Sequence, residues 1–453
     1  MVVNAERPGH SLHPGHSERP GHVESPGYAE SPGPAERLRS AGPGRHGRPG
    51  HGGVPTGNAQ DVARRYQEFS WREARGRSDA HEELSARIGQ DQELCELLAG
   101  SLPAGNKQQP QLLLAAVRHL DGPHAEQGPR GAAAYGRWRE WTIRHWDQVR
   151  DVIMRRGTQT NEPARCATLL PLLARLPQPL ALLEVGTSAG LCLHPDRYRY
   201  AYEHGHGHGH GHGHGHGHGH GHGHGHGHGH GHGHGHGYEY GEAGGPAAHA
   251  PLAEVGAADS PVVFHCQVQA PVPGAGPAGQ GASHLPTRLP EVVWRAGIDL
   301  APLDPVAEPD DLRWLQSLVW PGDEARAARL SAAVDAVRAV PRPRIVRGDL
   351  IDELPALAAE APAGATLVVF HTSVLSYLPY ARREEFARLV RSVLDGRDGG
   401  GHWISQEHHS VLPWLPLPAH HTPRPDDPLQ LTLALDGHPV ALTGPHGQSF
   451  RPL

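Results

Sequence analysis

Leu182-Leu183-Glu184-Val185-Gly186-Thr187-Ser188-Ala189-Gly190-Leu191 is the stretch that decides the fold. It joins an apolar run to an acid and then to a turn with two glycines four residues apart. The apolar run predicts a buried parallel strand, and the glycines predict a tight turn into the start of a helix. Parallel sheets bind nucleotide-like ligands at such a turn, because glycine lets a ligand approach the backbone and the helix start offers free N–H groups. An ordinary strand-to-helix turn is the alternative, since Ser188 replaces the second glycine of a Gly-x-Gly-x-x-Gly motif.

Around this stretch, strands and helices alternate from residue 158 to residue 453. We expect an α/β fold with a Rossmann-like, mostly parallel sheet covered by helices on both faces. A helix capped by Asn161 precedes the first strand, and residues 429–442 predict a terminal hairpin around Asp436-Gly437. Further strands are expected at residues 262–264, 292–299, 345–346, 366–371 and 402–405.

Residues 58–157 show only helical periodicity and predict an N-terminal helical cap. Asp61 and Asp91 are expected to cap helices, Pro110 to stand in a first helical turn, and Gly157 to end the segment. Two low-complexity segments interrupt the pattern: a Pro/Gly/His-rich tail over residues 1–57 and 17 consecutive His-Gly pairs over residues 204–237. Neither has an apolar face that could offset the entropy of ordering, so both are predicted to be disordered.

Composition excludes several classes of protein. A net charge of −7 without a basic cluster carrying interleaved aromatic residues argues against nucleic-acid binding. No leader and no uninterrupted apolar stretch indicates secretion or membrane spanning. The four cysteines have no Cys-x-x-Cys spacing, so buried thiols in a reducing, cytoplasmic compartment are expected.

Polar residues end several of the expected strands: Glu184, Asp299, Asp349, His371 and Gln406-Glu407. Ligands of open α/β sheets lie beyond the carboxyl ends of the strands, so we expect these side chains to converge on one crevice. Capping of the following helix is the alternative for each single residue, as for Asp349 before Leu350-Ile351. His371 and Glu407 are the candidates for general acid–base work.

The order of glycine turn, acid, Gly-Asp and polar strand end resembles class I S-adenosylmethionine-dependent methyltransferases. The resemblance implies S-adenosylmethionine as cofactor. It places the methionine part against Glu184, Gly186, Ser188 and Gly190, the ribose at Asp299 and the adenine near Asp349. Glu184 and Asp299 are 115 residues apart where about 20 are expected. The His-Gly tract and a hairpin predicted between residues 197–200 and 261–267 account for much of this excess.

A closer resemblance covers nearly all of residues 60–453. The chain is similar to the actinobacterial family known as domain of unknown function 2332, which implies a fold and no reaction. The similarity rests on the glycine turn and on residues 158–162, 165–167, 196–198, 295–300, 319–321, 369–375 and 444–447.

Gln159, Thr160, Asn161 and Glu162 head an otherwise apolar helix and are candidates for substrate contact. Capping by Asn161, with Glu162 in the first turn, explains half of this polar group. A methyltransferase acting on a small substrate is the first hypothesis. A non-catalytic module for a nucleotide-like ligand is the second, and a histidine-rich metal buffer is the third. Divalent metals are expected to bind the His-Gly tract adventitiously.

Overall fold

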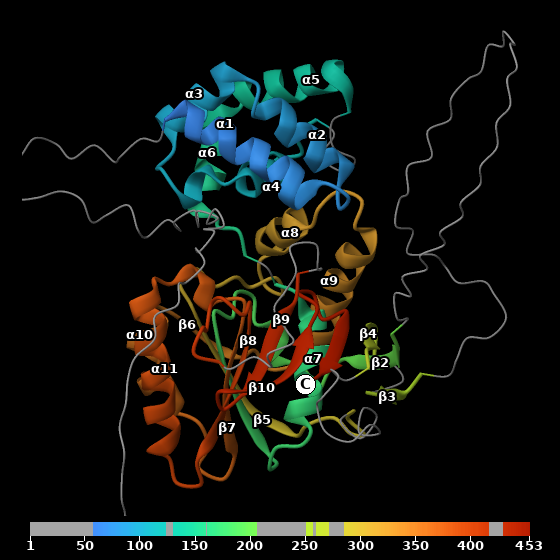
Figure 1. Cartoon of the computed structure of the whole chain (residues 1–453), viewed down its shortest axis with the longest axis vertical. Coiled ribbons are helices and arrows are strands. Elements are labelled where there is room, and N and C mark those ends of the chain that lie inside the picture. The colour runs from blue at the N-terminus through green and yellow to red at the C-terminus, as the bar shows by residue number, and fades with distance from the viewer. Residues whose placement is uncertain are drawn as a thin grey trace, which may run out of the picture. The chain divides into compact units, whose positions relative to one another are not determined.

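The computed structural model describes residues 58–123, 130–159, 161–205, 251–256, 260–270, 285–415 and 429–453. The predicted tail and all but the first two residues of the His-Gly tract fall outside this part of the chain. Thr160 falls outside it as well, so its predicted substrate contact stays a prediction. Figure 1 labels the helices and strands in chain order.

Between residues 58 and 155, the described residues form helices joined by turns and contribute no strand to the sheet. The helices include α1 (Ala59–Glu68), a π-helical turn (Phe69–Ala74), α2 (Asp79–Ile88), α3 (Gln92–Ser101), α4 (Pro110–His119), α5 (Gly131–Arg144) and α6 (Trp146–Arg155). Two predicted start signals are confirmed: Asp91 accepts from the backbone N–H of Leu94 at 3.0 Å to cap α3, and Pro110 begins α4. The cap predicted at Asp61 is wrong, because Asn58 caps α1.

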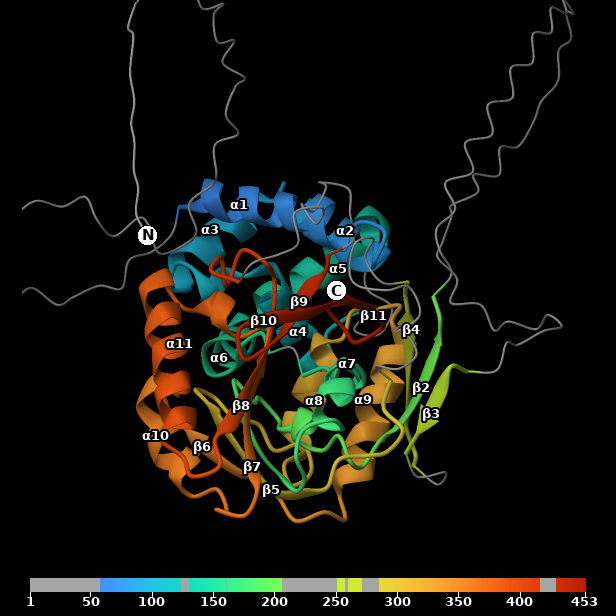
Figure 2. The same cartoon turned by 60° about the horizontal axis from the view of Figure 1, so that its bottom comes forward.

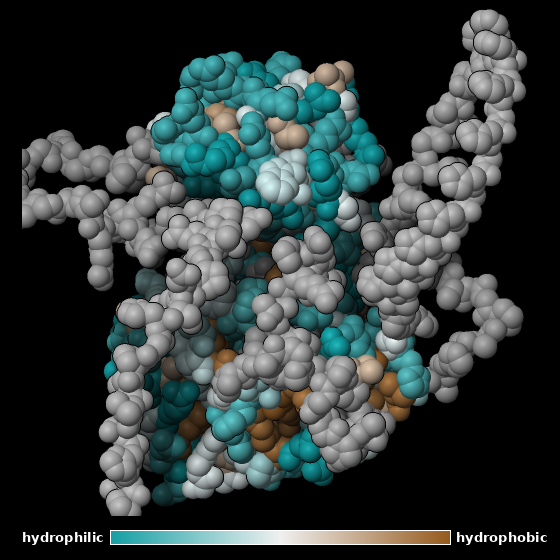
Figure 3. Space-filling model, viewed as in Figure 1, coloured by the Kyte–Doolittle hydropathy of each residue, from teal (hydrophilic) through white to brown (hydrophobic). Residues whose placement is uncertain are grey.

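Contacts with α8 (Pro309–Leu318) tie this helical part to the rest of the chain. The indole N–H of Trp314 on α8 donates to the carbonyl of Gly157 at 3.2 Å, and Arg156 pairs with Asp311 at 2.5 Å. Elsewhere at this contact, the buried hydroxyl of Ser78 donates to the carbonyl of Pro321 at 2.9 Å. These contacts hold the end of the helical part, at Arg156 and Gly157, against α8. The outer surface of this part is mainly hydrophilic (Figure 3).

Eleven strands of the described chain form one sheet in the order β3-β2-β4-β11-β10-β9-β8-β7-β1-β5-β6. They are β1 (Leu180–Val185), β2 (Arg199–His204), β3 (Ala253–Val255), β4 (Val263–Val268), β5 (Val292–Asp299), β6 (Arg344–Arg347), β7 (Thr366–Thr372), β8 (Gly401–Glu407), β9 (Leu431–Leu435), β10 (His438–Thr443) and β11 (Ser449–Pro452).

Five neighbouring strands, β6-β5-β1-β7-β8, run parallel, and the direction in which strands are added reverses at β1. α8 and α9 (Glu324–Val337) connect β5 to β6, α10 (Leu350–Ala359) connects β6 to β7, and α11 (Tyr380–Asp395) connects β7 to β8. Parallel strands need such crossovers, which cover the faces of the sheet. The predicted α/β class with a mostly parallel sheet is confirmed.

Two hydrophobic cores lie on the two faces of the sheet. Leu182 belongs to the core that contains side chains of α7 (Cys166–Leu173), α8 and α9, whereas Leu183 belongs to the core with those of α10 and α11. Successive side chains of a strand point to opposite faces, so β1 contributes to both cores and all six of its residues are buried. Figure 2 shows α10 and α11 apart from α8 and α9, with the central strands between them.

The far edge of the sheet differs in part from the prediction. Residues 197–200 and 261–267 are expected to form a hairpin, but β2 pairs with β4 in parallel and takes β3 as its antiparallel neighbour. An alternating apolar pattern marks a strand without specifying the direction of its partner, which explains the error. The terminal hairpin is confirmed: β9 and β10 pair antiparallel around Asp436 and Gly437, whose φ angles are 53° and 81°.

No helix of the described chain combines the length and apolar character that a membrane span requires. All four cysteines are buried and unpaired with one another, as expected.

Candidate ligand site at the glycine turn

The turn after β1 has the left-handed backbone that its glycines predict. φ is +70° at Gly186 and +69° at Gly190, and Ser188 between them has φ +51°. A 3-10 helix of three residues, Leu191–Leu193, follows in place of the longer helix that we expected. The chain then leaves for β2 at the far edge of the sheet, so this turn lacks the long helix whose dipole would favour an anion.

Both glycines are also required by packing. A Cβ atom on Gly186 would lie 2.5 Å from a methyl group of Val374, and one on Gly190 would lie 3.1 Å from Cδ1 of Ile345. The turn is thus in contact with residues that follow β7 and with β6. A ligand that approaches Gly186 from the side on which a Cβ would stand has to displace Val374.

Glu184 stabilises the turn from inside. Its carboxylate is 4 % exposed and accepts a hydrogen bond of 2.8 Å from the hydroxyl of Thr187. Burial, followed by the neighbouring thiol of Cys192, raises the pKa of Glu184 well above its usual value. The hydrogen bond with Thr187 orders the turn, whereas burial disfavours the ionised form of Glu184.

Asp299, at the end of β5, meets the same turn. One of its carboxylate oxygens accepts from the backbone N–H of Ser188 at 2.8 Å, and the other accepts from that of Ala301 at 2.8 Å. Gln159 reaches this carboxylate with its amide nitrogen at 3.4 Å and donates to the carbonyl of Ala301 at 2.8 Å. The structure therefore brings together three of the predicted residues, Gln159, Ser188 and Asp299, from three separate segments.

The helix cap expected at Asn161 is formed by Glu162 instead. Asn161 does not cap a helix: its amide donates to the carbonyl of Thr187 at 3.3 Å, and its Oδ1 atom is buried without a partner. Glu162 caps instead, accepting from the backbone N–H of Ala164 at 3.3 Å, and it forms an ion pair of 2.9 Å with Arg326 on α9. A 3-10 turn at Pro163–Arg165 comes before α7 and moves the cap by one residue.

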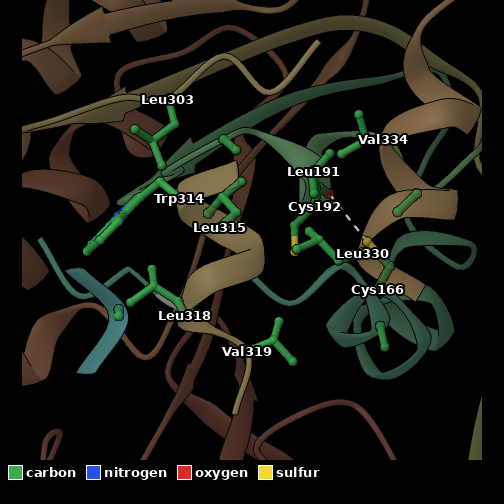
Figure 4. Close-up of a cluster of buried hydrophobic side chains, with 14 of the residues drawn as sticks. Cys166, Leu191, Cys192, Leu303, Trp314, Leu315, Leu318, Val319, Leu330 and Val334 are labelled. Carbon is green, nitrogen blue, oxygen red and sulfur yellow. Dashed lines mark hydrogen bonds between the residues drawn. The ribbon is translucent and has the colours of Figure 1, made fainter. Parts of the chain in front are cut away.

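A pocket opens beside these residues. Its volume, with the adjoining open solvent included, is about 280 Å³, and it is lined by Gln159, Asn161, Glu162, Pro163, Leu315, Leu318, Val319, Arg326 and Leu330. Three of the four predicted substrate residues thus line one hollow. Its apolar wall comes from α8 and α9, whose leucines continue into the buried cluster around Trp314 and Cys192 (Figure 4). The space left for solvent, about 10 Å³, holds roughly one water molecule in this conformation.

Asp349 does not join this site. It caps α10 by accepting from the backbone N–H of Ile351 at 2.9 Å, and the same oxygen pairs with Arg382 at 2.8 Å. Helix capping, the alternative considered for this residue, is confirmed.

His371 and Glu407 form a pair, but on the other face of the sheet. The Nδ1 atom of His371 lies 2.8 Å from Oε1 of Glu407, and the two side chains are 0 % and 2 % exposed. His371 packs against Phe386 of α11, in the core that contains Leu183, whereas Glu184 points to the opposite face. The expected convergence of all strand-end side chains on one crevice is therefore wrong. The catalytic roles of His371 and Glu407 stay predictions.

No role is predicted from the sequence for the buried Arg165. Its guanidinium donates to the carbonyl of Pro445 at 2.9 Å and to the carbonyl of Thr372 at 3.0 Å, which joins the start of α7 to β7 and to the loop before β11. The only signal for it is its place in Arg165-Cys166-Ala167, one of the runs on which the family resemblance rests. Arg326 stands on a helix of ordinary polar pattern and gave no signal.

Two buried histidines make stability depend on pH. Burial lowers the pKa of both His81 and His194 to about 3, with the charges of Arg118 and Arg295, respectively, acting in the same direction. In the unfolded chain both titrate near 6.5, so the unfolded state takes up protons first as the pH falls. The stability is full above that value and decreases downwards from it until about pH 3. We expect urea titrations to show a loss of about 2 kcal/mol per histidine at pH 5 relative to pH 8. A His81→Gln, His194→Gln double variant with the same pH dependence as the parent would contradict this cause.

Comparison with known proteins assigns the chain to a family. None of the curated proteins or solved structures compared with the chain matches it. Residues 63–451, which include the glycine turn, the pocket and the His371–Glu407 pair, match the family described as "uncharacterized protein conserved in bacteria (DUF2332)". The chain belongs to this family.

Proposed function

We propose that the protein is an S-adenosylmethionine-dependent methyltransferase with a Rossmann-like core and a small-molecule substrate. The observation that carries the proposal is the contact between Ser188 in the glycine turn and Asp299 at the end of β5. It lies beside β1, where the strand order reverses, which is the place at which open α/β sheets bind their ligands. The acid that a ribose would need is thus adjacent to the turn, despite the 115 residues between Glu184 and Asp299.

The polar atoms at the turn fit such a cofactor. The Ser188 hydroxyl and Oδ1 of Asn161 are buried without a hydrogen-bond partner, and the Asp299 carboxylate has lone pairs left beyond its present partners. Ser188, Asn161 and Asp299 would therefore hold the cofactor. When bound, S-adenosylmethionine supplies an electrophilic methyl group. Binding requires Val374 to move away from Gly186, because the turn is filled in this conformation.

Within this proposal, the residues of the chain position reactants rather than move protons. Gln159 connects Asp299 to the pocket lined by Leu315 and Leu318, so a substrate in the pocket lies next to the turn. The apolar wall of the pocket excludes water from its contents. The Glu184 carboxyl is held by Thr187 and keeps the turn in place.

Calorimetric titration of the full-length protein tests the proposal, with S-adenosylmethionine and its demethylated product compared against NAD and ATP. We expect binding of the first two. Ser188→Ala should weaken it at least tenfold and leave unfolding nearly unchanged, because it removes a hydroxyl that has no partner in the protein. Ser392→Ala, on the exposed face of α11, is the matched control. Absence of binding in the parent at millimolar concentration would refute the methyltransferase. Gly186→Ala is unsuitable as a test, because it collides with Val374.

A non-catalytic binding module is the second candidate. The observation that favours it is the position of His371 and Glu407, which are buried on the face of the sheet opposite Glu184. Neither of these two predicted acid–base residues lines the pocket beside the glycine turn. Binding of NAD or ATP in preference to S-adenosylmethionine, in the same titrations, would support this candidate.

We also propose a cytoplasmic location and a small-molecule partner. Four buried thiols without a disulfide support a reducing compartment. Among the described residues, no group of three histidines, cysteines or acids is placed to hold a metal ion, and we propose only adventitious metal binding for the His-Gly tract.

A further inference from the structure

An unusual concentration of arginines surrounds the loop between β10 and β11. Arg326 and Arg329 of α9, Arg165 before α7 and Arg77 before α2 are all close enough to His446 in this loop for their charges to act on it. Together with burial, which contributes most, they lower the pKa of His446 to about 3. The imidazole is therefore neutral at physiological pH and does not add to the positive charge.

This positive charge is only partly neutralised. Among the described residues, Glu162 is the only carboxylate within 4 Å of any of the four guanidiniums, and it pairs with Arg326. Arg165 donates to carbonyl groups instead, and Glu407 affects it only from a longer distance. Arg165 is buried, Arg326 and Arg329 are partly buried and Arg77 is exposed, so an anion bound near α9 would offset like-charge repulsion among partly buried guanidiniums.

Arg329 leaves one of its donors without a partner in the protein. Its Nε atom is buried without a hydrogen-bond partner. It stands three residues after Arg326 on α9, so the two side chains share one face of the helix. Arg326 also lines the pocket, and His446 lies 3.9 Å from the same carboxylate oxygen of Glu162 that Arg326 contacts. The unpaired charge is thus next to the mouth of a hollow with an apolar wall.

We propose that Arg326 and Arg329 bind the anionic group, a carboxylate or a phosphate, of a small molecule whose apolar part widens the pocket and packs against Leu315, Leu318 and Leu330. Guanidinium groups suit both anions, because their N–H donors match pairs of oxygen atoms. This small molecule would be the substrate of the proposed methyltransferase, and its identification as substrate rests on that proposed function. Binding of the anion needs no cofactor.

The test uses the full-length protein at constant ionic strength, with inorganic phosphate and benzoate as separate probes and chloride as the reference anion. Calorimetry and thermal unfolding are measured in parallel. We expect one probe to bind saturably and to raise the melting temperature, and the stronger of the two identifies the anion. Arg329→Gln should weaken this binding at least tenfold. It should also raise the stability of the probe-free protein, because it removes like-charge repulsion and an unpaired buried donor.

The control is Arg338→Gln, since Arg338 follows α9 but pairs with Asp335 in an exposed position. It should bind the probes as the parent does. Equal binding by the parent and Arg329→Gln would overturn the proposal, as would no binding of either probe. A lower stability of probe-free Arg329→Gln would also overturn it, because Arg329 would then be a structural residue. Failure of S-adenosylmethionine to bind, with probe binding intact, would refute the proposed function and leave the anion site standing.

Discussion

Glu407→Leu should lower the free energy of unfolding by about 3–5 kcal/mol. One oxygen of this carboxylate, Oε1, accepts three hydrogen bonds, from Nδ1 of His371 at 2.8 Å and from the backbone N–H groups of Val374 and Leu375 at 2.8 and 2.9 Å. His371, Leu375 and Glu407 are buried and Val374 is partly buried, so leucine leaves three donors without an acceptor in the protein. Urea unfolding followed by tryptophan fluorescence measures the loss, and Glu385→Leu on the exposed side of α11 should have almost no effect.

Glu407→Gln separates structure from catalysis at this pair. An amide oxygen still accepts from the two backbone N–H groups, so the loss of stability should be clearly smaller than for leucine. If Glu407→Leu unfolds like the parent, the buried carboxylate does not hold the segment after β7. Once a substrate is found, full activity of a folded Glu407→Gln variant would contradict the predicted acid–base role of Glu407.

Gly447→Ala should cost about 3 kcal/mol or more. Gly447 lies in the loop between β10 and β11 with φ +77°, and its Cβ would stand 2.0 Å from the carbonyl oxygen of Ala164 and 2.8 Å from the backbone nitrogen of Arg165. The left-handed backbone alone costs about 1 kcal/mol, and overpacking adds about 1–3 kcal/mol. The colliding atoms belong to the backbone of a 3-10 turn and cannot rotate away. Chemical denaturation of the full-length variant measures the effect.

Two other glycines serve as controls for this substitution. Gly399 has φ +86° and nothing within 4 Å of the new methyl group, so Gly399→Ala isolates the conformational cost. Gly100 lies within α3 with open space around it, and Gly100→Ala should stabilise the protein by about 0.5–1 kcal/mol. If Gly447→Ala cost no more than Gly399→Ala, the loop would not be packed against Ala164 as described.

The central strands could be predicted from the sequence because their burial on both faces leaves a simple signature. β1 and β7 are continuous apolar runs that end in a polar residue, and glycine marks the turn after β1. The caps at Asp91 and Asp349 follow from the local competition for free backbone N–H groups, which involves only a few neighbouring residues. The contact between Gln159 and Asp299 joins distant segments. The sequence indicates only that Gln159 belongs to a polar group that helix capping explains in part, and it does not point to Asp299 as the partner.

Features that depend on distant partners could not be predicted in this way. Alternation along β7 and β8 places His371 and Glu407 opposite Glu184, but which face receives the pocket depends on where α8 and α9 pack. The direction of β4 against β2 is decided by the crossover between them. The four arginines near His446 come from three segments, and no spacing within the chain relates these segments.

The connection from β2 to β3 begins and ends at two neighbouring strands, and β3 is the edge strand of the sheet. Its two ends, His204 and Ala253, therefore keep their positions whatever the length of chain between them, because the pairing of Tyr200 with Val255 sets the register. Doubling such a connection costs only about 0.6 kcal/mol in closure entropy. Replication slippage in a repeated hexanucleotide can thus add or remove His-Gly pairs almost without selection on folding. We expect natural alleles to differ in tract length while the sequences of β2 and β3 stay constant, so that this edge of the sheet behaves as a neutral site for repeat expansion.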